Sequence, residues 1–237
     1  KSYLIIRDIF PEWALDMRLI NKGLPYLFFK LIAQFQYKVA DSIGVQSPGN
    51  IKYFSKSKYG KKVVVLQNWL GEPGKSESSI QVDETKLAGR KICIYAGNMG
   101  VAQGMKIIID LAKKVNKDTN LGFIFVGRGS QVDQLKKLSV EYGLTNILFY
   151  DEIDPDEIPN LYKQCHIGLV SLDLRHKSHN VPGKFLTYMQ SGIPVLANIN
   201  PGNDLLSIIK DEHVGRAIST NDLNELKQSL EDLLNDI

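Results

Sequence analysis

From Lys91 onward, short apolar runs alternate regularly with amphipathic segments. The runs are rich in β-branched and aromatic residues, and the segments between them repeat apolar residues every three or four positions. Six strands are expected, at residues 92–95, 123–126, 147–149, 167–170, 194–197 and 215–218. Strands that alternate with helices over short loops form parallel sheets through right-handed crossovers. The pattern therefore predicts an α/β fold, a doubly wound parallel sheet with helices on both faces.

The first seventy residues hold fewer elements than such a domain needs. They are expected to contain about three strands and two or three helices. Residues 71–87 are rich in Gly, Pro, Ser and Glu, which is typical of a linker. We therefore expect 1–70 to be the incomplete end of one domain, 71–87 a linker and 88–237 a second domain. A chain that opens at Lys1 without Met is expected to be part of a longer protein.

One predicted helix in the first seventy residues, at 26–40, is unusually apolar. Leu27, Leu31, Phe35 and Val39 recur at four-residue spacing and form one stripe. Packing in a core is the expected role of this stripe, and docking on a membrane face is the alternative. No apolar run in the sequence approaches the roughly 20 residues that a membrane span needs.

Composition limits the classes of protein to consider. The chain has 237 residues, 43% of them hydrophobic and 23% charged, which is typical of a globular protein. A net charge of +3 suits an anionic ligand or a membrane surface, but is too small to indicate nucleic acid. Cys93 and Cys165 each lie beside an apolar run without metal-ligand spacing. They are expected to be buried, reduced thiols.

The unusual loops all follow predicted strands. Residues 97–104 and 127–129 are rich in glycine, 151–154 are acidic, and 173–184 are polar. In an open parallel sheet, ligands bind outside the carboxyl ends of the strands. Glycines let backbone N–H groups approach an anion, and the following helix N-termini favour negative charge. Four such loops predict a diphosphate site, with Arg128 and Lys184 supplying full positive charges.

Several other chemistries are disfavoured. Val132 stands where a dinucleotide fingerprint has its third glycine, and no Gly-Lys-Ser/Thr follows residues 97–104. His166, His176, His179 and His213 lack metal-ligand spacing, and no nucleophile elbow occurs. The sequence therefore argues against a nicotinamide oxidoreductase, a metal site and a nucleophilic hydrolase.

Three motifs together resemble a known family. They are Tyr-Ala-Gly-Asn-Met-Gly at 95–100 with Gln103 and Gly104, Phe-Val-Gly-Arg-Gly at 125–129, and Pro-Gly-Lys-Phe-Leu-Thr-Tyr-Met at 182–189 followed by Gly-Ile-Pro-Val at 192–195. This set resembles the C-terminal half of GT-B glycosyltransferases. It is most similar to the retaining group called family 4, which includes bacterial enzymes of surface-polysaccharide synthesis such as transferases of N-acetylfucosamine. Residues 7–12 resemble a stretch late in the N-terminal domain of such enzymes.

The resemblance implies a GT-B type fold: a Rossmann-like donor-binding C-terminal domain and a partial Rossmann-like N-terminal domain. It implies transfer of a sugar from a nucleotide diphosphate sugar, UDP-linked, to a saccharide or polyprenyl-diphosphate-linked acceptor in polysaccharide or O-antigen (lipopolysaccharide) biosynthesis. No cofactor, metal or nucleic acid is expected. A cytoplasmic location is implied, with peripheral contact at the inner face of the plasma membrane.

The resemblance also implies a set of donor-binding residues. These are Gly97, Asn98, Gly100, Gln103, Gly127, Arg128, Gly129, Ile153, His179, Asn180, Val181, Pro182, Gly183, Lys184, Phe185 and Thr187. Many members of the family carry two glutamates where this chain has His179 and Thr187, so no catalytic residue is assigned beyond His179 as a candidate. A nucleotide-sugar epimerase on the same scaffold and a non-catalytic nucleotide-binding fragment remain as alternatives.

Overall fold

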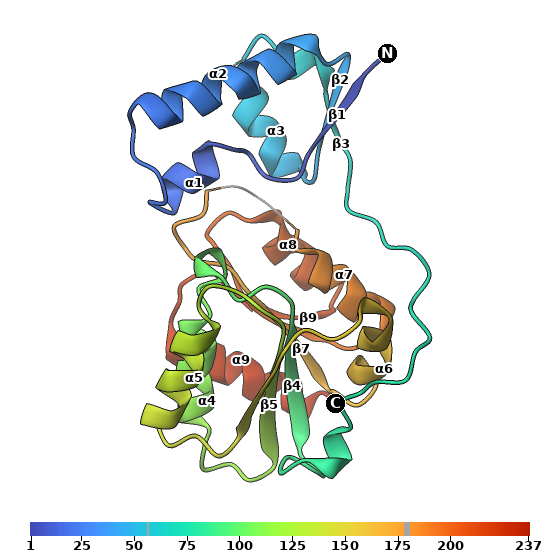
Figure 1. The fold of residues 1–237 in the computed structure, drawn as a ribbon. Coiled ribbons are helices and arrows are strands. Elements are labelled where there is room, and N and C mark those ends of the chain that lie inside the picture. Colours follow the sequence, from blue (N-terminus) through green and yellow to red (C-terminus); the bar gives the residue numbers. More distant parts are fainter. Residues whose placement is uncertain (56, 178–180) are drawn as a thin grey trace.

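Two parallel β-sheets, each covered by helices, make up the chain (Figure 1). The structure is a computed structural model that describes residues 1–55, 57–177 and 181–237. We call residues 1–65 the small unit and residues 78–237 the large unit. The small sheet has the order β1-β2-β3, with strands β1 (Tyr3–Ile6), β2 (Ser42–Val45) and β3 (Val63–Val65). Its helical elements are α1 (Glu12–Asp16), α2 (Leu24–Val39), α3 (Pro48–Ser55) and the 3-10 turn η1 (Gly60–Lys62).

The core of the small unit lies between its sheet and helices α2 and α3. Ile43 and Val45 of β2 are fully buried, and Phe54 of α3 contacts Tyr37 of α2 edge-on, with ring centroids 5.2 Å apart. Both helices lie on the same side of the sheet, to the left of its strands in Figure 1. Successive right-handed crossovers that move in one direction across a sheet place their helices in this way.

The apolar stripe of α2 does not pack in this core, so the expectation from the sequence is wrong. Ala33 and Tyr37 are the buried residues of α2. The four stripe residues are 52–65% exposed: Leu27, Leu31, Phe35 and Val39. Sequence periodicity located a helix with an apolar stripe, but it could not say which side of the helix the small sheet covers.

The large sheet has six parallel strands in the order β6-β5-β4-β7-β8-β9. These are β4 (Lys91–Ala96), β5 (Leu121–Val126), β6 (Ile147–Tyr150), β7 (Ile167–Ser171), β8 (Val195–Asn198) and β9 (Gly215–Ile218). The α-helices are α4 (Lys106–Lys114), α5 (Val132–Glu141), α6 (Ile158–Tyr162), α7 (Gly183–Gln190), α8 (Asp204–Asp211) and α9 (Leu223–Asn235). Short 3-10 turns are η2 (Val82–Glu84), η3 (Val101–Gln103) and η4 (Pro155–Glu157). The predicted doubly wound sheet is confirmed.

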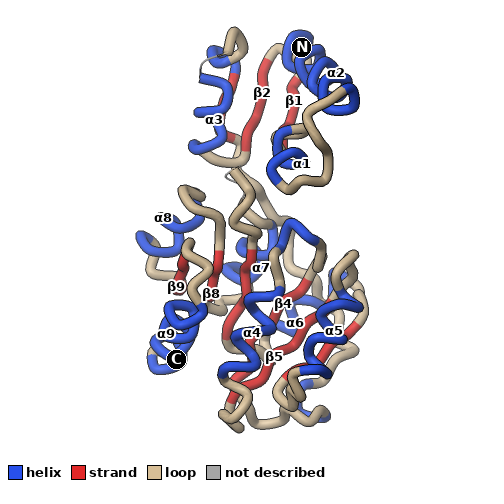
Figure 2. Tube along the Cα trace, turned by 90° about the vertical axis from the view of Figure 1, so that its left-hand side faces the viewer, coloured by secondary structure: helices blue, strands red, loops and turns tan. Residues whose placement is uncertain are grey.

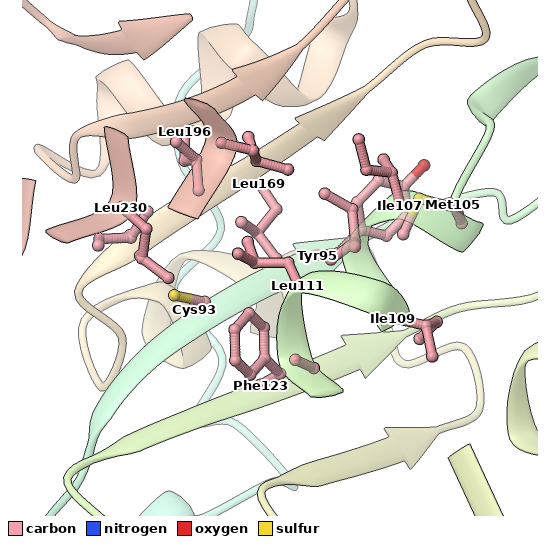
Figure 3. Close-up of a cluster of buried hydrophobic side chains, with 14 of the residues drawn as sticks. Cys93, Tyr95, Met105, Ile107, Ile109, Leu111, Phe123, Leu169, Leu196 and Leu230 are labelled. Carbon is pink, nitrogen blue, oxygen red and sulfur yellow. The ribbon is translucent and has the colours of Figure 1, made fainter. Parts of the chain in front are cut away.

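Side chains of the large sheet enter two separate cores, one on each face. Cys93 and Tyr95 of β4 pack with α4, α5 and α9, and Figure 3 shows part of this core. Ile92 and Ile94 of the same strand pack on the other face with α6, α7 and α8. Alternation along a strand sends neighbouring side chains to opposite faces. A strand covered on both faces is therefore apolar throughout, as the sequence of β4 indicated.

The connection between the sheets is not a linker over its whole length. Ile80, Val82 and Leu87 are buried in the core of the large unit, and the Val82 N–H donates to Oε1 of Gln164 at 2.8 Å. The second half of the predicted linker at 71–87 therefore packs on the large unit, because its apolar residues find a surface there. Among the described residues, we find no helix with the length and apolarity to cross a membrane.

Candidate functional site

The strand order of the large sheet reverses direction next to β4. The chain moves from β4 outward to β5 and β6, and then crosses back to β7 on the other side of β4. The loops that leave β4 and β7 therefore diverge, and a crevice opens between them at the carboxyl ends of the strands. Two cavities that contain predicted site residues lie at this edge of the large sheet.

The smaller cavity, of about 420 Å³, is built from the loops that follow three strands and from two helices. Its lining comes from the ends of β4, β5 and β6 and from α6 and α7: Ala96, Gly97, Asn98, Val126, Gly127, Arg128, Glu152, Ile153, Pro155, Ile158, Tyr162, Lys184 and Thr187. The volume is within the range of small-molecule pockets, and the lining combines apolar walls with a few charged groups.

Lys184, in the first turn of α7, points across the cavity floor to β4. Its ammonium nitrogen lies 2.9 Å from the hydroxyl oxygen of Tyr95 and 4.2 Å from the centroid of that ring. The Tyr95 hydroxyl in turn donates to the Asn98 carbonyl at 2.7 Å. Burial lowers the pKa of Lys184 to about 8. A half-buried ammonium group at a helix N-terminus is an anion-binding arrangement.

Arg128 lines the same cavity but is already paired. Its Nε lies 2.8 Å from Oε2 of Glu152, and both side chains are largely exposed. An exposed ion pair of this kind contributes about 0–1 kcal/mol, so an anionic ligand can take the place of the carboxylate. The structure thus brings the two predicted cations to one cavity, and it pairs Arg128 with a carboxylate of the acidic loop at 151–154.

The glycine-rich loops pack against each other through their backbones. The Gly97 N–H donates to the Val126 carbonyl at 2.9 Å, and the Gly127 N–H donates to the Tyr150 carbonyl at 3.1 Å. A Cβ on Gly127, whose φ is +135°, would lie 2.2 Å from the Gly97 carbonyl oxygen. These glycines are thus needed for close approach of two loops. In this structure the amides of Gly97 and Gly127 are paired with carbonyls, and an anion site at these loops stays a prediction.

The larger cavity, of about 520 Å³, lies between the two units. The small unit contributes Arg7, Asp8, Trp13 and Gln46. Asn68, Trp69 and Leu70 line it from the connection between the sheets. The large unit contributes Asn98, Ala102, Gln103, Leu172, His176, Val181, Pro182, Gly183 and Asn200. Asn98 lines both cavities, which places them side by side along the edge of the large sheet.

Specific contacts hold the units together around this cavity. The Asn68 side-chain amide donates to the Val181 carbonyl at 2.8 Å, just before α7. Trp13 of α1 stacks on His176, with ring centroids 6.2 Å apart and an interplanar angle of 16°. In Figure 1, α1 lies next to the loop that follows β7. The segment before α7 is therefore held by the connection between the sheets, and the loop after β7 by the small unit.

The structure divides the predicted site residues into four groups. Those in the smaller cavity are Gly97, Asn98, Gly127, Arg128, Ile153, Lys184 and Thr187. Those in the larger cavity, besides Asn98, are Gln103, Val181, Pro182 and Gly183. Three support the site from outside these linings: Gly100, Gly129 and Phe185. His179 and Asn180 lie outside the described residues. The candidate catalytic role of His179 therefore stays a prediction.

The three supporting residues have structural contacts that explain their place beside the cavities. The Gly100 N–H donates to the side-chain oxygen of Gln103 at 2.9 Å. A Cβ on Gly129 would lie 2.4 Å from the Met99 carbonyl oxygen. Phe185 is 4% exposed and packs in the core under α7. The predicted contact between Phe185 and a ligand stays a prediction, and its side chain is buried in this core.

Sequence reasoning did not single out several residues that line the cavities. Tyr95 ended a predicted strand and no role was predicted for Tyr162; both are buried, and Tyr95 also orients Lys184. Trp13 and Trp69 showed no periodicity that would mark them. A polar tip on a buried aromatic residue is the one signal that could have indicated the role of Tyr95.

The described histidines and cysteines do not form metal sites. His166 is held by backbone contacts, since its Nδ1 accepts from the Ile92 N–H at 3.1 Å. Cys93 and Cys165 are free and buried, as predicted. Across the described ranges, no three His, Cys, Asp or Glu side chains come together as metal ligands would.

The fold and the position of the cavities define a class of protein, a GT-B glycosyltransferase. Two Rossmann-like sheets face each other across a cavity, and the structural neighbours described below share this architecture. The family of glycosyl transferases group 1 matches residues 77–237. The chain belongs to this family.

Two bacterial relatives of the chain bear glycosyltransferase names. "Probable glycosyltransferase WbjE" of Pseudomonas aeruginosa is 25% identical over 98% of this chain and 60% of its own length. "Putative colanic acid biosynthesis glycosyl transferase WcaI" of Escherichia coli K12 is 26% identical over 70% of this chain and 44% of its own length. The chain thus spans about 60% of the first relative, and less of the second.

Solved structures support the fold. Anabaena Alr3699/HepE, crystallised with UDP and glucose, superposes with a TM-score of 0.72 at 15% identity, covering 99% of this chain and 62% of that one. WaaG, a glycosyltransferase of lipopolysaccharide biosynthesis, gives a TM-score of 0.67 at 15% identity over 99% of this chain and 66% of its own. At this identity the similarity establishes the shared fold.

Proposed function

We propose that the chain binds a nucleotide diphosphate sugar, with UDP as the nucleotide, in the smaller cavity at the edge of the large sheet. The single observation that supports this proposal most directly is the position of Lys184. Its ammonium group is held by Tyr95 at the N-terminus of α7, in a cavity of nucleotide size that also contains Arg128. Two cations and a helix N-terminus are suited to a diphosphate.

In the proposed reaction a sugar leaves the diphosphate and joins an acceptor. The leaving group gains negative charge as the glycosidic bond breaks, and Lys184 and Arg128 are placed to stabilise that charge. Stabilisation of the leaving group suits a retaining transfer without an enzyme-bound sugar. We infer the retaining course and an amino-deoxy sugar such as N-acetylfucosamine from the sequence motifs. No resident cofactor is needed for this chemistry.

The larger cavity is the proposed place for the sugar and the acceptor. It adjoins the smaller cavity at Asn98, and it combines hydrogen-bonding groups such as Gln46 and Asn68 with the partly exposed ring of Trp69. Such a mixed surface fits saccharides, which present hydroxyls at their edges and C–H groups on their faces. We propose a saccharide or polyprenyl-diphosphate-linked acceptor of surface-polysaccharide synthesis, met at the cytoplasmic face of the plasma membrane.

Calorimetric titration of the 237-residue chain with UDP and UDP-sugars tests the donor site. We expect measurable affinity for UDP, and a loss of about tenfold or more in Lys184→Met, because one charge-assisted contact is removed. Lys137→Met, on the exposed side of α5, is the matched control and should bind as the parent does. Absence of UDP binding by the parent chain would refute the proposal.

A second measurement separates transfer from epimerisation. Incubating the chain with a UDP-sugar alone and following the sugar by NMR reports any change of configuration in the absence of an acceptor. Membership of the glycosyltransferase family favours a result in which the donor keeps its configuration. Conversion to an epimer without an acceptor would identify an epimerase.

A further inference from the structure

A chain of side-chain hydrogen bonds leads from the small sheet to the start of α7. The amide nitrogen of Gln46, the residue after β2, donates to the side-chain oxygen of Asn68 at 2.8 Å. Asn68, in the connection between the sheets, donates from its own amide nitrogen to the Val181 carbonyl at 2.8 Å. Gln46 and Val181 are buried, and hydrogen bonds in series polarise and strengthen one another where water is excluded. We call these two contacts the Gln46–Asn68 relay.

The N-cap residue of α7 cannot fix the start of this helix by a capping hydrogen bond. It is Pro182, which offers neither a side-chain acceptor nor a backbone N–H. Val181 is restricted to extended conformations because a proline follows it, and the ring of Pro182 fixes φ, here at −61°. Lys184 is the second residue of the helix. A stiff connection thus joins the Val181 carbonyl, which the relay holds, to Lys184.

The connection between the sheets contacts α7 near both of its ends. Gln190, the last residue of this helix, donates to the Gly71 carbonyl at 3.0 Å, whereas Asn68 holds the residue before its N-cap. Loops lie between the small unit and α7 in both views of the molecule (Figures 1 and 2). The relay is therefore a route by which the end of the small sheet sets the position of α7.

We propose that Asn68 is a positioning residue for the donor site, and that Gln46 acts through it. This inference rests on the proposed function, in which Lys184 binds the diphosphate. Neither Asn68 nor Gln46 belongs to the described lining of the smaller cavity, so neither contacts a nucleotide there. By holding the Val181 carbonyl, the relay keeps the Lys184 ammonium group against the Tyr95 hydroxyl. Nucleotide binding in the large unit thereby depends on a contact made by the small unit.

Calorimetric titration of the 237-residue chain with UDP tests this role. UDP is the probe because it carries no sugar that could reach Asn68 in the larger cavity. Asn68→Ala should bind UDP about threefold to tenfold more weakly, since a hydrogen bond that positions α7 is lost. Asn116→Ala is the matched control and should bind as the parent does. Asn116 also bridges two backbone segments, accepting from the Thr145 N–H at 3.0 Å and donating to the Gly143 carbonyl at 3.3 Å, and it lies outside the described lining of both cavities.

A second variant shows whether the two side chains act in series. Gln46→Met keeps the length of the side chain and removes the donor to Asn68, so it should weaken UDP binding, but by less than Asn68→Ala does. Gln46→Met combined with Asn68→Ala should bind no more weakly than Asn68→Ala alone, because the first contact has no effect once the second is gone. Additive losses in the double variant would show that Gln46 does not act through Asn68. Gln46→Met also carries the test if Asn68→Ala does not fold.

Two readouts distinguish positioning from a general loss of stability. Hydrogen–deuterium exchange in residues 183–190 should become faster in Asn68→Ala and stay unchanged in Asn116→Ala. The pH at which UDP affinity falls should move above the parent value near 8, because an ammonium group that leaves its buried place beside Tyr95 has a pKa closer to the usual range of lysine. Faster exchange throughout the large unit with an unmoved pH profile would identify a merely structural role and overturn the inference.

The outcomes separate this inference from the proposed function. Equal UDP affinity in Asn68→Ala and the parent would overturn the positioning role and leave the donor site intact. Absence of UDP binding by the parent would refute the donor site, and the positioning role would fall with it. Weaker UDP binding in Asn68→Ala, with faster exchange confined to the start of α7, is the result that the relay predicts.

Discussion

The ammonium nitrogen of Lys184 on α7 lies 2.9 Å from the hydroxyl of Tyr95 on β4, two residues that are 89 positions apart in the sequence. β4 and β7 are neighbours in the sheet, and the chain enters α7 after β7, so the fold brings the two groups together. Burial of the ammonium group lowers the pKa of Lys184 to about 8. The charge proposed to bind a diphosphate therefore titrates within an accessible pH range.

Affinity for UDP should fall as the pH rises through about 8. Only protonated Lys184 attracts the diphosphate, and one pH unit above its pKa about a tenth of the molecules keep that proton. We expect binding at about pH 9 to be about tenfold weaker than at about pH 7, measured by calorimetry. Lys184→Met should bind weakly at both pH values and show no such slope. A parent profile that stays flat from about pH 7 to 9 would contradict the role of Lys184.

The same pKa predicts a pH dependence of stability. Folding lowers the pKa of Lys184 from its usual range near 10.4 to about 8, so the unfolded chain binds more protons between these values. The free energy of unfolding contributed by this group should therefore rise with pH from about 8 to about 10.4. Comparing urea unfolding of the parent with Lys184→Met across that window checks the sign, because the variant lacks the titrating group.

Tyr95→Phe should weaken both the fold and the proposed site. The substitution keeps the buried ring beneath Lys184 and removes the hydroxyl that donates to the Asn98 carbonyl. We expect a loss of about 1 kcal/mol in the free energy of unfolding, and UDP binding weaker by severalfold, because the ammonium group loses its acceptor. Tyr142→Phe, at the C-terminal end of α5 and outside the lining of both cavities, controls for general effects of removing a tyrosine hydroxyl. Undiminished UDP affinity in Tyr95→Phe would show that Tyr95 does not position Lys184.

Glu152→Gln should strengthen UDP binding at low salt. Glu152 pairs with Arg128 at 2.8 Å, and removing its charge frees the guanidinium for the diphosphate. We expect a gain of about twofold to fivefold that disappears at high salt, because both groups are exposed and screened. The gain should also disappear in an Arg128→Ala background. Weaker binding in Glu152→Gln would instead mean that Glu152 contacts the ligand itself.

Gly168→Ala tests the packing of α7 on the large sheet. A Cβ at Gly168 of β7 would lie 2.5 Å from the ring of Tyr188, whose hydroxyl contacts the carbonyls of Ile94 and Leu169 at 3.1 and 3.2 Å. We expect a loss of about 1–3 kcal/mol in the free energy of unfolding from overpacking. Gly71→Ala is the control, since nothing lies within 4 Å of its added Cβ. Equal stability of the two variants would show that Tyr188 moves aside without cost.

Much of the large unit could be predicted from the order of its residues. The predicted strand at 215–218 coincides with β9, and the other five strands of this sheet differ from prediction by one or two residues at an end. The prediction worked because parallel strands are buried on both faces and therefore read as apolar runs between amphipathic helices. The loops at the carboxyl ends of these strands were placed correctly for the same reason.

In the small unit, the sequence did not predict which side of α2 would be buried against the sheet. An apolar stripe on a helix normally marks its buried side, but here Ala33 and Tyr37 take that position and Leu31 and Phe35 remain exposed. The identity of the buried side depends on how α2 lies on β1 and β2, and hydrophobic periodicity does not contain that information.

By itself the sequence determined that a doubly wound sheet would form and that its loops would meet at one edge, because local periodicity and parallel strand order require both. Only the tertiary structure decided what the charged groups contact. It placed Lys184 against Tyr95 and Arg128 against Glu152, and it turned the apolar stripe of α2 outward. These outcomes depend on contacts between distant segments, and such contacts exist only after the sheets and helices have packed together.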